Sequence, residues 1–285
     1  QDATLCYYKL LHNDYIRTKI FAGPKNVLDE ENVVLYKTYF SQYKYLIDLF
    51  ANGTVGCNNI MCYGSPGVGK SRFIYLCSRM MHCHIYSIDL SQYVNNKTLL
   101  MKMFNGMDFN LNPGSTALAT LFSSMFSHDK KCIIALDEFD YAIEKIIENS
   151  KVDNNEITLD PTGKVITTNK LDRLELSDLL ELFQGSVPMP NRYIIANTNN
   201  FHKINNLIPA LFRPGRMTSI EFKHITWDIL NEITMHYYEQ EMTHKPLNIT
   251  IPTSMIIEEI QNYKQMEKPF DEFEQHLINL LKASL

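Results

Sequence analysis

The chain has 285 residues, of which 45% are hydrophobic and 21% charged, and its 27 basic and 32 acidic side chains give a formal net charge of −5. This composition excludes a disordered chain, and the length supports one large domain or two small ones. The charge gives no reason to expect a nucleic-acid or acidic-membrane partner, although a basic groove on an acidic protein stays open.

Three further features bear on the cellular setting. The six cysteines form no CxxC pair, which predicts reduced thiols in an intracellular and most simply cytoplasmic protein. The segment contains no run of 18 apolar residues, so no membrane-spanning helix is predicted in it. Because the first residue is Gln1 rather than Met, an upstream targeting or membrane segment stays open. The many Asn and Ile residues are typical of AT-rich genomes, including those of large DNA viruses.

Apolar periodicity predicts helices and strands that alternate along the first 222 residues. The predicted helices cover residues 39–50, 72–81 and 116–126. The predicted strands are short apolar runs at 60–63, 84–88, 132–136, 192–196 and 219–222. This alternation predicts an α/β fold with a largely parallel sheet that is covered by helices on both faces.

Two other segments stand apart from this alternation. Within the polar stretch 149–170, Asp160-Pro161-Thr162-Gly163 separates two short runs, which predicts an inserted hairpin with strands near 156–159 and 164–168. After residue 224 the strand pattern stops. Helices are predicted there at 227–238, 253–263 and 270–281, forming a small helical domain.

A phosphate-binding loop is predicted between the first strand and the helix at 72–81. Residues 64–71 read GSPGVGKS and fit the pattern GxxxxGK[ST], in which glycines let backbone N–H groups converge on a phosphate. Lys70 would reach the β- and γ-phosphates of a nucleotide, and the Ser71 hydroxyl would bind Mg²⁺. A chance glycine turn is disfavoured by the strand before and the helix after it. The predicted nucleotide-binding residues are Gly64, Ser65, Pro66, Gly67, Val68, Gly69, Lys70, Ser71 and Arg72.

Polar residues follow two of the later strands. The run 132–136 leads into Asp137 and Glu138, at the end of a strand where α/β sheets bind ligands. We expect Asp137 to hold Mg²⁺ and Glu138 to orient or deprotonate an attacking water, although such a pair alone is often a solvated helix start. The strand at 192–196 leads into an Asn-rich stretch that ends at Asn200, where a neutral amide could position water beside a phosphate.

An arginine pair follows this Asn-rich stretch. Arg213 and Arg216 are always charged and suit phosphate oxygens, while the alternative is two surface arginines. The predicted catalytic residues are Glu138, Lys70, Asn199, Arg213 and Arg216, and the predicted metal ligands are Ser71 and Asp137.

These elements in this order resemble the AAA family of the AAA+ ATPases. The matching segments are 64–71 (Walker A), 132–138 (Walker B), 194–199 (sensor 1) and 210–216, which reads ALFRPGR (the arginine-finger region). Within the family, residues 177–185 and the strand near 85–90 are most similar to the Bcs-type subgroup, which includes the mitochondrial Rieske-protein translocase.

The resemblance implies a P-loop α/β domain at 35–223 and a helical lid at 224–285, after an N-terminal extension at 1–34. It implies ATP and Mg²⁺ as ligands and a homo-oligomeric ring, a hexamer or a heptamer. Arg213 and Arg216 would then serve the nucleotide of the neighbouring subunit. Asn199 aligns best with the family's sensor residue, and Asn197 stays open as an alternative because the spacing to Arg213 is longer than usual.

The resemblance leaves several positions undecided. Tyr93 and Phe104 compete as the aromatic residue of the family's substrate-gripping central loop, and the predicted hairpin lies near the place of its second central loop. The segment His82-Cys83-His84 is interpreted as an ordinary strand start rather than a metal site, because alternating side chains point to opposite faces. No HExxH motif of a fused metalloprotease is present.

The sequence therefore predicts an ATP-hydrolysing ring motor that remodels or translocates a protein substrate. A nucleic-acid motor, such as a viral replication or packaging ATPase, is the first alternative, disfavoured by the arginine segment and the low basic content. A nucleotide-dependent assembly scaffold is the second, and the complete Walker B pair argues against it.

Overall fold

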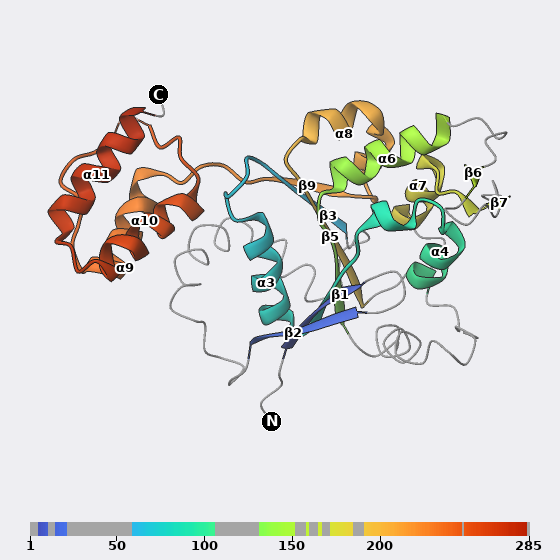
Figure 1. Ribbon diagram of the computed structural model, residues 1–285, viewed down its shortest axis with the longest axis horizontal. Coiled ribbons are helices and arrows are strands. Elements are labelled where there is room, and N and C mark those ends of the chain that lie inside the picture. The colour runs from blue at the N-terminus through green and yellow to red at the C-terminus, as the bar shows by residue number, and fades with distance from the viewer. Residues whose placement is uncertain are drawn as a thin grey trace.

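The computed structural model describes residues 5–10, 15–21, 59–105, 131–151, 158–159, 165–166, 172–184, 191–246 and 248–283. Its centre is a seven-stranded sheet in the order β2-β1-β4-β5-β8-β3-β9 (Figure 1). Its strands are β1 (Leu5–Leu10), β2 (Tyr15–Phe21), β3 (Asn59–Tyr63), β4 (His84–Ser87), β5 (Cys132–Leu136), β8 (Arg192–Thr198) and β9 (Thr218–Glu221). Neighbouring strands are parallel except for β1 and β2, which form an antiparallel hairpin.

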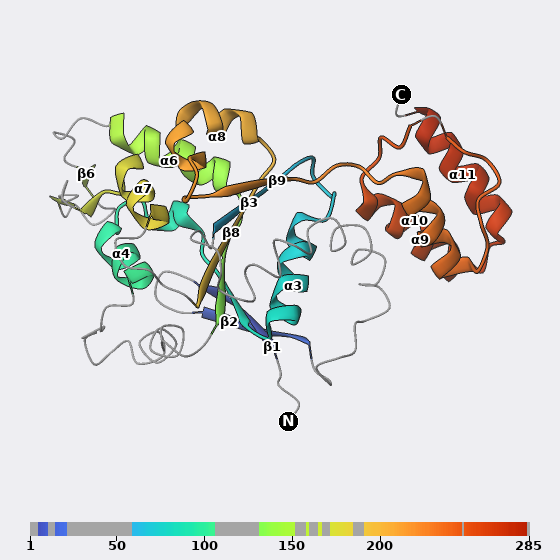
Figure 2. The same ribbon diagram turned by 180° about the vertical axis from the view of Figure 1, so that it is seen from behind.

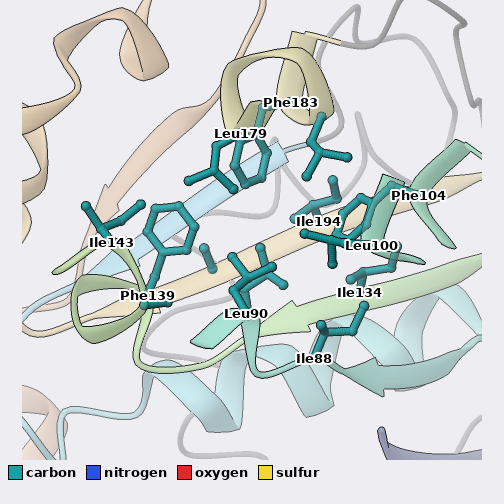
Figure 3. Packing of buried hydrophobic residues seen from close by; sticks show 14 of the residues in the cluster. Ile88, Leu90, Leu100, Phe104, Ile134, Phe139, Ile143, Leu179, Phe183 and Ile194 are labelled. Atoms are coloured by element: carbon teal, nitrogen blue, oxygen red, sulfur yellow. The ribbon is translucent and has the colours of Figure 1, made fainter. Parts of the chain in front are cut away.

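Helices cover both faces of this sheet. One face packs on α3 (Lys70–Met81), while α4 (Lys97–Asn105), α6 (Phe139–Lys151) and α7 (Leu176–Gln184) lie on the other (Figure 1). The side chains of β5 show why the two faces differ, because Ile133 joins the core beneath α3 and Ile134 joins the opposite core. The opposite core also contains Phe139, Phe183 and Ile194 (Figure 3). The predicted α/β fold with a largely parallel sheet is confirmed.

Most predicted elements lie where the sequence placed them. The strand β8 ends at Thr198, two residues later than predicted, so that Asn197 belongs to the strand itself. The inserted hairpin forms as β6 (Thr158–Leu159) and β7 (Val165–Ile166), which pair antiparallel. The helices predicted at 39–50 and 116–126 lie outside the described residues.

The N-terminal hairpin was not predicted. It lies within residues 1–34, which the sequence analysis treats as an extension, yet β1 pairs parallel with β4 and so lengthens the central sheet. Tyr8 on β1 stacks on Tyr86 of β4 with ring centroids 5.0 Å apart. The signal was the aromatic and β-branched residues of β2, which follow Asn13 and Asp14, residue types that favour turns. The strand β4 with which β1 pairs, however, lies more than 60 residues away along the chain.

The last helices form a separate small bundle, called here the lid. Its helices are α9 (Trp227–Tyr238), α10 (Thr253–Gln265) and α11 (Phe270–Ala283), with their own apolar core (Figure 2). Tyr238 stacks on Phe273 with centroids 5.2 Å apart. The lid lies to one side of the sheet, and the N-terminus of α10 contacts the main domain, since the Ser254 N–H donates to the Gly67 carbonyl at 3.1 Å.

The two candidates for the aromatic residue of the central loop, Tyr93 and Phe104, are both buried, so neither faces solvent as that role requires. Tyr93 ends the 3-10 helix η2 (Leu90–Tyr93) and is 1% exposed, and Phe104 of α4 is 5% exposed. Both pack in the core beneath α6, and burial raises the pKa of Tyr93 to about 12. A side chain that grips a substrate must reach solvent, whereas these two stabilise the fold.

The five described cysteines are free and buried, in agreement with the predicted reduced thiols; Cys57 lies outside the described residues. Within the described ranges no group of three metal-ligating side chains occurs. No helix of the described part of the chain is long and apolar enough to cross a membrane.

Candidate nucleotide site

The loop between β3 and α3 has the backbone that a phosphate-binding loop requires. Gly64 has a φ of +146°, and a Cβ there would lie 2.1 Å from the Phe222 carbonyl oxygen, so no other residue fits without displacing the chain. Val68 is fully buried in the core beneath α3 and anchors the loop. The helix α3 begins directly after Gly69, which directs the N–H groups of its first turn and its positive dipole end toward the loop.

Gly67 connects this loop to the lid. Its φ of +77° favours glycine, and a Cβ at this position would lie 2.4 Å from Ser254 Oγ and 2.8 Å from Pro252 Cβ. The sequence analysis did not foresee a contribution from Ser254, because nothing local to residue 254 indicates a partner almost 190 residues earlier.

We expect Gly67→Ala to lower the free energy of unfolding by more than Gly215→Ala does. Both positions have positive φ, which costs an alanine about 1–2 kcal/mol. A Cβ at Gly215 meets nothing within 4 Å, whereas at Gly67 it overpacks the lid, at a further cost of about 1–3 kcal/mol. Urea unfolding of both variants measures the difference, and equal losses would contradict the close approach.

Lys70 is held inside the loop. Its Nζ donates to the carbonyl oxygens of Gly64 and Ser65 at 2.7 and 2.8 Å and to Asn199 Oδ1 at 2.7 Å. The side chain is 8% exposed, and burial lowers its pKa from the ordinary lysine value. An ammonium group at this point, beside the backbone N–H groups of the loop, can bind phosphate oxygens once they replace its present acceptors.

The acidic residues after β5 face the same space. The strand is buried along its whole length, and it delivers the partly exposed Asp137 to the carboxyl edge of the sheet. Glu138 follows with an exposed side chain and a φ of +50°, a left-handed conformation that strains a non-glycine residue. Such strain often occurs at functional positions, because the fold holds the side chain in one direction.

Two asparagines at the end of β8 complete the polar surroundings. Asn197 Nδ2 donates to Asp137 Oδ1 at 3.0 Å and to Ser71 Oγ at 3.4 Å, while Asn199 contacts Lys70. Asn197 lies within β8, whereas Asn199 follows the last residue of the strand, Thr198. Both alternatives considered for the sensor position are therefore present at the site, with different partners.

These side chains line one cavity of about 430 Å³. Its lining residues are Pro66, Gly67, Gly69, Lys70, Ser71, Arg72, Asp137, Glu138, Asp140, Asn197, Thr198, Asn199 and Ser254. The other predicted loop residues support it from behind, since the carbonyls of Gly64 and Ser65 hold Lys70 and Val68 is in the core. Asp140 at the start of α6 was missed by the sequence analysis, as was Ser254.

The arginine pair does not line this cavity. Arg213 is exposed at the end of the 3-10 helix η4 (Pro209–Phe212). Arg216 lies against the same turn, where its Nη1 donates to the Ala210 carbonyl at 2.8 Å and its own carbonyl accepts from Asn59 Nδ2 at 2.8 Å. The two guanidinium groups thus differ, because Arg216 holds the turn together and Arg213 is presented to solvent.

The donor set fits Mg²⁺. Ser71 Oγ and the Asp137 carboxylate are hard oxygen ligands, and both contact the same amide group of Asn197. A glycine-rich loop that opens a helix, with an acidic strand end beside it, defines a P-loop nucleotide-binding site.

Comparison with known proteins agrees with this class. Residues 60–224, more than half of the chain, match the family model described as "ATPase family associated with various cellular activities (AAA)". The chain belongs to the AAA family of ATPases, which confirms the predicted family.

The curated relatives are plant proteins of Arabidopsis thaliana. AAA-ATPase At3g50940 is 26% identical over 233 residues, covering 78% of this chain and 43% of its own length. AAA-ATPase At3g28600 is 27% identical over 187 residues, which cover 65% of this chain and 34% of that protein. AAA-ATPase At3g28570, mitochondrial, is 26% identical over 190 residues, which again cover 65% of this chain and 34% of that protein. The chain thus spans less than half the length of these relatives. They agree with the predicted Bcs-type subgroup and give no support to a viral source.

Proposed function

We propose that this chain is the motor domain of a homo-oligomeric AAA ring, in a reducing intracellular compartment, that uses ATP hydrolysis to remodel or translocate a protein. The proposal rests on one observation, namely that the groups expected at an ATPase site lie in two separate places on the chain. One cavity gathers the phosphate loop, both Walker B carboxylates and the asparagines, while Arg213 is exposed outside it. A phosphoryl-transfer site needs a cation that compensates the developing charge, and a second copy of the chain would supply it.

Within one subunit, the loop N–H groups and Lys70 bind the phosphates. Ser71 and Asp137 would hold Mg²⁺, and the bound ion would neutralise phosphate charge. Because Asn199 Oδ1 accepts a hydrogen bond from Lys70 Nζ, a phosphate that takes over this ammonium group would release the Asn199 amide for a new partner in the cavity. Glu138 accepts the proton of the attacking water.

The lid contributes through α10. The hydrogen bond from the Ser254 N–H to the Gly67 carbonyl places the first turn of α10 against the phosphate loop. A change in the loop on nucleotide binding or release therefore displaces the lid relative to the sheet, which is the movement that a ring motor needs.

The test is ATPase activity of size-defined oligomers, measured alone, with an unfolded protein and with single-stranded DNA. We expect the assembled ring to hydrolyse ATP faster than the monomer, and the protein to stimulate it further. Salt-dependent stimulation by DNA alone would favour a nucleic-acid motor. Tight ATP binding with negligible turnover in the assembled ring would favour a scaffold.

A further inference from the structure

Asn197 occupies a position between the two predicted metal ligands. The central strand β8 lies between β3 and β5, and in the register of the sheet Asn197 is opposite Cys62 while Ala196 is opposite Leu136. The residue after Leu136 is Asp137, so the strand order itself brings the Asn197 side chain to the Asp137 carboxylate.

The orientation of this amide is determined by its neighbours. An ionised carboxylate only accepts hydrogen bonds, so the Asn197 Nδ2 group must face Asp137 Oδ1, at 3.0 Å, and the Oδ1 atom of Asn197 must face elsewhere. The side chain is only 5% exposed, and Asn197 Oδ1 is buried without a hydrogen-bond partner among the described residues. Buried amide oxygens are nearly always paired, so this atom requires a donor that binds at the site.

Among the residues that the structure describes, no protein group around Asn197 Oδ1 supplies that donor. The three hydrogen bonds of Lys70 Nζ go to Gly64, Ser65 and Asn199, and Ser71 Oγ contacts the Nδ2 end of the Asn197 amide. A hydrated divalent cation does supply one, because Mg²⁺ keeps several of its waters in nucleotide sites and their O–H groups are strong donors.

We propose that Asn197 is a positioning residue for hydrated Mg²⁺. Its Nδ2 fixes the Asp137 carboxylate and the Ser71 hydroxyl, and its Oδ1 accepts a hydrogen bond from a water of the metal. The two asparagines thus have different tasks: Asn197, within β8, acts on the metal, and Asn199, just after β8, acts on Lys70. The inference rests on the proposed function, because it assumes that the cavity binds the magnesium complex of ATP.

The experiment measures metal affinity without hydrolysis. In a Glu138→Gln parent, a fluorescent ATP analogue is titrated in EDTA, and Mg²⁺ is then titrated at constant nucleotide. Outer-shell partners of a metal site change affinity by about 10- to 100-fold, so we expect Asn197→Leu to weaken Mg²⁺ binding by that factor. The affinity of Asn197→Leu for the analogue in EDTA should equal that of the parent. The matched control, Asn206→Leu, changes an exposed asparagine of α8 (Phe201–Leu207) that does not line the cavity, and it should keep the parent's Mg²⁺ affinity.

Three results separate the alternatives. Mg²⁺ affinity equal to that of the parent in Asn197→Leu would overturn the inference, and so would a parallel loss of nucleotide affinity in EDTA, which indicates a structural role only. Asn197→Ala, which removes the amide without adding volume, carries the same expectation if the leucine variant does not fold. Failure of the Glu138→Gln parent itself to bind the analogue would instead contradict the proposed function.

Discussion

Replacing Glu138 by glutamine should leave ATP binding intact and reduce turnover by about 10²- to 10⁴-fold, the usual contribution of a general base. The physical reason is local, because the amide keeps the shape and position of the side chain but cannot take a proton. The left-handed backbone at residue 138 holds either side chain in the same direction. Phosphate release in steady state and binding of a fluorescent ATP analogue, measured on the same oligomer, check both halves of this prediction.

The matched control for this variant is Glu148→Gln. Glu148 lies on α6, the helix that begins directly after Glu138; it is exposed, but it does not line the nucleotide cavity. The control receives the same chemical change and should turn over ATP at the wild-type rate. Wild-type turnover in Glu138→Gln would remove Glu138 from its assigned role.

The second large effect is expected for Arg213→Ala. Arginine fingers contribute about 10³- to 10⁵-fold to phosphoryl transfer, so this variant should bind ATP normally and hydrolyse almost none. Mixed with Lys70→Ala subunits, which bind nucleotide poorly but have an intact Arg213, it should regain part of the activity. The recovery arises at interfaces where the intact arginine of one subunit faces the intact Lys70 site of its neighbour.

This experiment has an internal control. A double variant, Lys70→Ala with Arg213→Ala, offers no arginine and should rescue nothing when it is mixed with Arg213→Ala. Rescue by the double variant, or the absence of rescue by Lys70→Ala, would show that Arg213 does not act across a subunit interface. Arg216→Ala adds a comparison, because Arg216 is tied to the Ala210 carbonyl and its loss should also lower the stability of the turn.

The parts of the site that could be predicted from the sequence are those encoded by neighbours along the chain. The glycines of the phosphate loop, Lys70 and the two acidic residues after β5 each belong to a short segment whose spacing carries its own chemistry. The structure brings them to one cavity because parallel strands end at the same edge of the sheet.

The parts that could not be predicted depend on distant contacts. Whether Asn197 or Asn199 faces Ser71 depends on the register of β8 between β3 and β5, and no local pattern carries that register. Ser254 reaches the loop only because the lid packs there. Tyr93 stayed one of two candidates because an aromatic residue after a strand fits a loop tip as well as a core, and only the packing beneath α6 decides between them.

The contact between residues 67 and 254 also has a mechanical meaning. The lid touches the phosphate loop near the start of α10, while α11, whose 14 residues extend about 21 Å, lies on the far side of the bundle. The bundle can therefore work as a lever whose fulcrum lies close to the phosphates. A shift of a fraction of an ångström at the loop would be amplified at the outer end of the lever, where force on another molecule could be applied.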